Sequence, residues 1–181
     1  QRLLPELQSV KLANPIAANL GVMRLSLWPG LLQAALDNQR RQQDRVRLFE
    51  LGSVFLREGT VVSEPRRVAG IALGLRVPEQ WADKAEDVGF HDVKADLESL
   101  ISLSNASQDF VFDSKSLACL HPGRSAAVYR DGVCIGHVGE LHPELVKQMG
   151  FVGAPVLFEL DLIAATRLTV ARAAQVSRFP Q

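Results

Sequence analysis

The sequence has few cysteines, no net charge and no long hydrophobic run. Cys119 and Cys134 are its only cysteines, which are too few for a disulfide framework and suit small core positions in a reducing compartment. Its 20 basic residues balance 20 acidic ones, so no domain-wide field attracts DNA, RNA or an anionic membrane. A membrane span needs about 18 or more apolar residues, and neither such a run nor a signal-peptide pattern is present. We therefore expect a cytoplasmic protein without a DNA or membrane partner.

The 181 residues, 47% of them hydrophobic, are enough for one globular domain with a sizeable core. The chain begins at Gln1 without Met and ends at Gln181 without a closing secondary-structure element. We therefore expect it to be a piece of a longer polypeptide.

Residues 45–58 are apolar on both faces when read with a period of two. One face carries Val46, Leu48, Gly52, Val54 and Leu56, and the other carries Phe49, Leu51 and Phe55. Strands that are apolar on both faces lie inside sheets that are covered on both sides. The pattern predicts one continuous strand at the centre of the fold, paired antiparallel with a second strand over residues 68–75.

Three helices are predicted around this strand. Ser26 is a candidate cap for the first helix, which tolerates Pro29 in its first turn. A second helix is predicted over residues 92–101, where the apolar positions recur at helical spacing. A third, short helix follows His142 as its cap and ends near Gly150.

Further strands are predicted over residues 109–112, 125–129, 133–138 and 156–162. Asp131-Gly132 is a strong signal for a tight hairpin turn between two of them. Together these elements predict an α+β fold in which an antiparallel sheet is flanked by helices.

Two cysteines and two histidines superficially form a metal-binding pattern. Cys119 and His121 lie two residues apart, and Cys134 and His137 lie three apart. Within a strand, an odd separation sends the two side chains to opposite faces, whereas zinc ligands are presented together from a turn. We therefore expect no metal at these residues.

The loop around His121 could supply the parts of a small hydrolase. His121 is a possible general base, Arg124 a possible anion-binding group and Ser125 a possible nucleophile. The structural alternative is a turn at Pro-Gly before a strand, with Arg124 paired to a carboxylate such as Glu140. No Gly-x-Ser-x-Gly turn or phosphate-binding glycine loop accompanies these residues, which favours the structural alternative.

Several short motifs, found in a fixed order along the chain, match one known family. They are Met23-Arg24-Leu25-Ser26-Leu27, Pro29-Gly30-Leu31-Leu32, Arg47-Leu48-Phe49-Glu50-Leu51-Gly52-Ser53-Val54-Phe55, Leu120-His121-Pro122-Gly123-Arg124-Ser125-Ala126, Gly136-His137-Val138-Gly139-Glu140-Leu141-His142-Pro143 and Phe158-Glu159-Leu160. Over nearly its whole length the chain therefore resembles the beta subunit of bacterial phenylalanine–tRNA ligase.

The resemblance implies a fold similar to the catalytic core of class II aminoacyl-tRNA synthetases. It implies a degenerate core-like domain over residues 1–168, and a linker over residues 169–181 toward a missing ferredoxin-like anticodon-binding domain. Polar and glycine positions of the family motifs are structural candidates, with no catalytic, cofactor-binding or metal-binding residue among them. These candidates are Arg24, Glu50, Gly52, His121, Arg124, Glu140 and His142.

One position of the family motifs indicates that the ATP-binding arginine is missing. In active class II enzymes a strand ends with Phe-Arg-x-Glu, and its Arg binds the α-phosphate of ATP in a charge-matched, bidentate contact. Here the matching run places Leu56 at the Arg position, and Arg57 leaves the opposite face of the strand. The glycine-rich third signature motif is also missing near Phe158, where Arg167 is the nearby cation. The resemblance therefore predicts a degenerate ATP site with apolar side chains, Leu56 among them.

The resemblance also implies partners. The domain would support assembly with the catalytic alpha subunit, in a complex of two alpha and two beta chains. The whole enzyme would use ATP and magnesium to join phenylalanine to its tRNA during protein biosynthesis, whereas this chain alone would be inactive and bind no cofactor.

Overall fold

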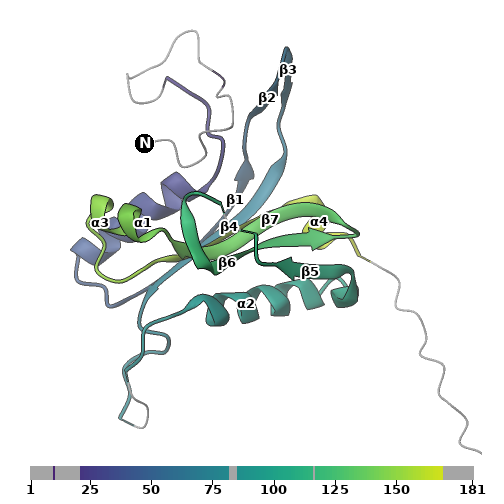
Figure 1. Cartoon of the computed structure of the whole chain (residues 1–181). Helices are drawn as coiled ribbons and strands as arrows, with labels where there is room; N and C mark the ends of the chain where they lie inside the picture. Colours follow the sequence, from purple (N-terminus) through teal and green to yellow (C-terminus); the bar gives the residue numbers. More distant parts are fainter. Residues whose placement is uncertain (1–9, 11–20, 82–84, 116, 169–181) are drawn as a thin grey trace, which may run out of the picture.

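The computed structural model describes residues 10, 21–81, 85–115 and 117–168. In this part of the chain, six strands form one antiparallel sheet in the order β1-β4-β8-β7-β6-β5, and β2 and β3 form a separate hairpin (Figure 1). The strands are β1 (Arg45–Ser53), β2 (Leu56–Glu58), β3 (Val61–Ser63), β4 (Arg66–Gly74), β5 (Phe110–Asp113), β6 (Leu120–Arg130), β7 (Val133–Leu141) and β8 (Val156–Asp161). The helical elements are α1 (Trp28–Arg40), α2 (Phe90–Ser102), the 3-10 turn η2 (Ser107–Asp109), α3 (Pro143–Met149) and α4 (Leu162–Thr166). The predicted antiparallel sheet with flanking helices is confirmed.

Side chains of β4 alternate between two hydrophobic cores on opposite faces of the sheet. Ala69, Ile71 and Leu73 pack in the core that includes α1, while Val68 and Ala72 pack in the core that includes α2. Because successive side chains of a strand point to opposite faces, α1 and α2 cover opposite sides of the sheet. Figure 1 shows α2 running along its face of the sheet and the β2–β3 hairpin projecting away from it.

The predicted turns and helix ends are confirmed at two places. Asp131 and Gly132 join β6 to β7 with φ angles of 51° and 77°, which a two-residue type I′ hairpin turn requires. His142 caps α3, because its Nδ1 accepts a 3.3 Å hydrogen bond from the backbone N–H of Glu144. Gly150 ends the same helix in the left-handed conformation, at φ 80°.

The prediction of one continuous strand over residues 45–58 is wrong beyond Ser53. The next two backbone N–H groups bond elsewhere: that of Val54 donates to Pro65 O at 3.0 Å, and that of Phe55 donates to Arg24 O at 2.9 Å. Leu56 then begins β2, which pairs with β3 outside the main sheet. The alternation of apolar residues depends on side-chain burial and not on which strand is the pairing partner. It therefore continues through the break after Ser53.

The prediction that this strand lies at the centre of the sheet is also wrong. Within the described residues β1 pairs with β4 alone and is an edge strand. Val46 is buried under α1, whereas Phe49 is 74% exposed and Leu51 is 51% exposed on the other face. A sequence that is apolar on both faces does not reveal whether a helix of the same chain covers both of them.

The two cysteines occupy different environments. Cys119 is buried, as predicted, and burial raises the pKa of its thiol to about 11. Cys134 is exposed in β7, so the prediction that both cysteines are core residues is wrong for Cys134. Both thiols are free.

Two further predictions concern membrane insertion and the linker after the domain. No helix in the described residues is long and apolar enough to cross a membrane. The linker predicted over residues 169–181 lies outside the described part of the chain.

Candidate functional site

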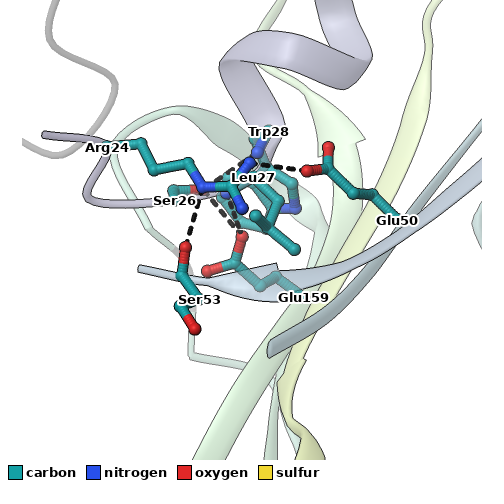
Figure 2. A network of polar contacts seen from close by, with 7 residues as sticks. All are labelled: Arg24, Ser26, Leu27, Trp28, Glu50, Ser53 and Glu159. Carbon is teal, nitrogen blue, oxygen red and sulfur yellow. Dashed lines mark hydrogen bonds and ion pairs between the residues drawn. The ribbon is translucent and has the colours of Figure 1, made fainter. Parts of the chain in front are cut away.

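A network of polar contacts joins the segment before α1 to the sheet. Figure 2 shows its side chains and backbone groups gathered where α1 begins, above β1 and β8. The members are Arg24, Ser26, Leu27, Trp28, Glu50, Ser53 and Glu159. Three of the predicted candidates, Arg24, Glu50 and Gly52, lie in or beside this cluster.

Glu159 of β8 holds the start of α1. Its Oε2 accepts a 2.8 Å hydrogen bond from Ser26 Oγ and a 2.7 Å bond from the Leu27 backbone N–H. Ser26 Oγ in turn accepts a 3.1 Å bond from the Trp28 backbone N–H. The N-cap residue of α1 is Leu27, one residue after the predicted cap at Ser26. The indole N–H of Trp28 donates to Phe158 O at 3.0 Å. Three of these four contacts therefore join the start of α1 to β8 of the sheet.

Arg24 ties the same segment to the end of β1. Its Nη1 donates to Glu50 Oε1 at 2.6 Å, and its Nε donates to Ser53 O at 2.7 Å. The guanidinium lies over Gly52, where an added Cβ would come within 2.3 Å of Arg24 Nη2. The missing side chain of Gly52 therefore makes room for Arg24.

The network is suited to holding segments together rather than to chemistry. The Arg24 guanidinium is neutralised by Glu50, and Glu159 already accepts two hydrogen bonds through one oxygen. Burial raises the pKa of Glu159, while the bonds from Leu27 and Ser26 and the charges of Arg67 and Arg24 act in the opposite direction. The carboxylate of Glu50 beside Arg24 would repel a phosphate placed here, so the network is a poor anion site.

The raised pKa of Glu159 gives a testable pH dependence. The folded protein takes up a proton on Glu159 at a higher pH than the unfolded chain, for which the ordinary value is 4.5. The contribution of Glu159 to stability is therefore largest at low pH and declines as the pH rises from the ordinary value through the raised folded value. In urea titrations, the unfolding free energy of the wild type minus that of Glu159→Gln should fall across this window. A difference that rises or stays flat would contradict the assignment.

The second group of candidates surrounds the turn at Pro122-Gly123. Arg124 Nη1 lies 2.9 Å from Glu140 Oε2, so the predicted ion pair is confirmed. His121 Nδ1 accepts a 3.1 Å bond from the Gly123 backbone N–H, and its Nε2 lies 3.4 Å from Arg124 Nη2. Ser125 Oγ donates to His121 O at 2.7 Å, so its hydroxyl bonds to the backbone and not to the imidazole. The nucleophile-to-base contact of a hydrolase is absent from this loop in the described structure.

The cysteines and histidines of the superficial metal pattern do not converge. No group of three or more His, Cys, Asp or Glu side chains within the described residues is placed to hold a metal ion. Burial lowers the pKa of His137, and the charges of Lys115 and Arg67 lower it further. His137 is thereby favoured as a neutral side chain beside Glu159, its cross-strand neighbour on β8.

Leu56, Arg57 and Arg167 make contacts that are typical of structural residues. Leu56 is partly buried and packs against the core that includes α1. The Nε of Arg57 donates to Gly59 O at 3.0 Å, within its own hairpin, and Arg167 pairs with Asp131. That Leu56 marks a former ATP site stays a prediction.

Most of the sequence matches a family model. The model of the phenylalanyl tRNA synthetase beta chain CLM domain matches residues 1–162. The chain belongs to this CLM domain family. The resemblance noted in the sequence is thereby confirmed.

Relatives of this CLM domain include three proteins named phenylalanine–tRNA ligase beta subunit. The one from Pseudomonas putida is 42% identical over 177 residues, covering 98% of this chain and 22% of the relative. The one from Chromobacterium violaceum is 46% identical over 170 residues, covering 94% and 21%. The one from Thiobacillus denitrificans is 44% identical over 181 residues, covering 100% and 22%. The chain thus spans about a fifth of the length of these relatives.

Solved structures of one tRNA synthetase share the fold of the CLM domain. Two structures of pyrrolysyl-tRNA synthetase from Desulfitobacterium hafniense superpose with TM-scores of 0.59 and 0.63, at 13% and 14% identity. They cover 87% and 94% of this chain, and 51% and 58% of their own. The predicted likeness to the core of a class II synthetase is therefore confirmed at the level of the fold.

Glu159 and Trp28 belong to the network of this CLM domain but are not among the candidates predicted from the sequence. Glu159 is an acidic residue that lies between the apolar residues Phe158 and Leu160 in β8. Because a buried carboxylate needs hydrogen-bond donors, such a position is a signal that can be found by sequence alone. Trp28 gives no comparable signal, since its indole partner is a backbone carbonyl 130 residues away.

Proposed function

We propose that this chain is a non-catalytic core-like module of a longer phenylalanine–tRNA ligase beta subunit. It supports assembly of that subunit with the catalytic alpha chain, in a complex of two alpha and two beta chains, and thereby supports aminoacylation of tRNA with phenylalanine in the cytoplasm. The observation that carries the proposal is the packing of Leu56 against the hydrophobic core. By the resemblance of the sequence motifs, Leu56 stands where an active class II enzyme has the arginine that binds ATP.

The nearby cations support the same proposal. Arg57 is turned toward Gly59 in its own hairpin, and Arg167 is paired with Asp131. Arg24 is held by Glu50 and Ser53. ATP binding depends on free cations aimed at its phosphates, and each of these guanidinium groups is already engaged. We therefore assign ATP and magnesium to other parts of the enzyme.

The proposal predicts that the module makes no contact with ATP. The complete beta subunit should show no saturable ATP binding by calorimetry in the absence of alpha. In the alpha–beta complex, Arg57→Ala and Arg167→Ala should leave phenylalanine-dependent exchange of pyrophosphate into ATP within about twofold of the wild type, because neither side chain reaches nucleotide.

The control for this experiment is the wild-type complex purified in parallel, which also shows whether beta co-purifies with alpha. Exchange lost on Arg57→Ala, with the complex still assembled, would show that the module binds ATP. A beta subunit that folds but never co-purifies with alpha would overturn the assembly role.

A further inference from the structure

The uncovered face of β1 forms an apolar patch, called here the β1-edge patch and made of Phe49, Leu51 and Phe158. Phe49 is 74% exposed and Leu51 is 51% exposed. Beside them a groove of about 190 Å³ separates β1 from α2, with Val93 and Ala72 among its lining residues. Side chains of this size on an open sheet edge are a liability for a soluble domain unless something covers them.

The local geometry extends this patch across three strands. Phe49 pairs with Gly70 of β4, and Gly70 pairs with Phe158 of β8. Gly70 leaves the space that the Phe158 ring occupies, since an added Cβ would lie 2.4 Å from Phe158 Cε1. The two aromatic side chains therefore flank a glycine on one face of the sheet, and Leu51 continues the surface along β1.

Charged side chains surround the patch on the same face of the sheet. Arg47 pairs with Asp96 of α2 at 3.2 Å, bridging β1 and α2 beside the groove. Arg45, at the start of β1, and Arg66, opposite Ser53 at its end, are exposed. Neither Arg45 nor Arg66 forms an ion pair with a described residue. A surface that fits the β1-edge patch is apolar at its centre and acidic at its two ends.

We propose that the β1-edge patch is covered by another segment of the same beta-subunit polypeptide, with an apolar face and acidic flanks. The inference rests on the proposal that this chain is part of a longer beta subunit. About four-fifths of the Pseudomonas putida relative lies outside the matched region, since the match covers 22% of it.

Two other occupants fit these observations less well. Antiparallel pairing of β1 with β1 of a second copy would bring Arg45 of one copy toward Arg66 of the other, and like charges placed opposite each other destabilise a sheet. A separate alpha chain would leave the edge open until it arrives. A tethered segment instead acts at a high effective concentration from the moment of synthesis.

The test is thiol labelling of the complete beta subunit, purified without alpha. Phe49→Cys provides a thiol in the patch, and the native exposed Cys134 provides the internal reference after peptide mass spectrometry. Each site's maleimide labelling rate in buffer is divided by its rate in denaturant. We expect the Phe49→Cys thiol to be protected at least tenfold more than Cys134, at every protein concentration. Adding Arg66→Glu should raise its labelling several-fold, because the acidic flank is then repelled.

Each other outcome overturns the proposal. Protection that appears only with alpha identifies the partner subunit as the occupant, and protection that disappears on dilution identifies a second copy. Rapid labelling under all conditions shows that nothing covers the patch. Leu51→Cys repeats the measurement if Phe49→Cys lowers the yield of folded protein. Because alpha is absent from the decisive sample, failure here is distinct from failure of assembly.

Discussion

Gly136→Ala is expected to lower the unfolding free energy of the domain by about 3 kcal/mol or more, which corresponds to a fall of about 6–12 °C in Tm for a domain of this size. Gly136 lies in β7 where it meets β8. An added Cβ would lie 2.0 Å from Glu159 O and 2.8 Å from Leu160 Cα. Both are backbone atoms of a central strand, so the clash can be relieved only by moving β7 and β8 apart. Thermal unfolding followed by circular dichroism measures the effect.

Gly123→Ala is the matched control for this substitution. Gly123 lies in the neighbouring strand β6, and an added Cβ would make ordinary contacts with His121 at 3.7 and 3.8 Å. Gly123→Ala should change the unfolding free energy by no more than about 1 kcal/mol, because alanine also lowers the conformational entropy of the unfolded chain. Equal stabilities for the Gly136→Ala and Gly123→Ala proteins would show that β7 and β8 do not approach as closely as described.

Glu159→Ala is expected to lower the unfolding free energy by about 2–3 kcal/mol, because it leaves two buried hydrogen-bond donors without an acceptor. The donors are Ser26 Oγ and the Leu27 N–H, on residues that are 4% and 1% exposed. Removing the partly buried carboxylate also removes its desolvation cost, which limits the loss of unfolding free energy. Hydrogen exchange should locate the damage: the amides of Leu27 and Trp28 should exchange faster than amides of α2.

Glu159→Gln distinguishes the lost acceptor from the lost charge. Both observed bonds go to a single oxygen of Glu159, and the amide oxygen of Gln can accept both. The Gln variant should therefore keep most of the stability near neutral pH. If Gln and Ala were equally destabilising, the charge of Glu159, and not its role as an acceptor, would hold α1 to β8.

Local signals in the sequence were sufficient for most of the secondary structure. The turn at Asp131-Gly132 and the helix cap at His142 depend on a few neighbouring residues, so residue type alone reveals them. The place of β1 in the sheet depends on β8, which lies about 100 residues later and takes the central position beside β4. No pattern within residues 45–58 carries that information, and the central position predicted for this strand was therefore wrong.

The candidate site was predictable to a similar extent. The ion pair between Arg124 and Glu140 was predicted as part of the structural alternative for the His121 loop, in which Arg124 pairs with a nearby carboxylate. The network around Glu159 was missed because its parts come from segments more than 130 residues apart in the chain. Residue types suggest that a buried carboxylate has partners, but only the fold shows which hydroxyl and which N–H they are.

The position of β8 also has a consequence for synthesis on the ribosome. The β1–β4 pair and the β5–β6–β7 meander become joined only through β8, which is inserted between β4 and β7. Translation adds roughly 5–20 residues per second, so β4 emerges roughly 4–16 s before the strand that unites the two halves, and β7 roughly 1–3 s before it. Until residues 156–161 leave the exit tunnel, β4 and β7 each present an unpaired edge to solvent. Nascent chains stalled before β8 are therefore the form of this protein most in need of a chaperone.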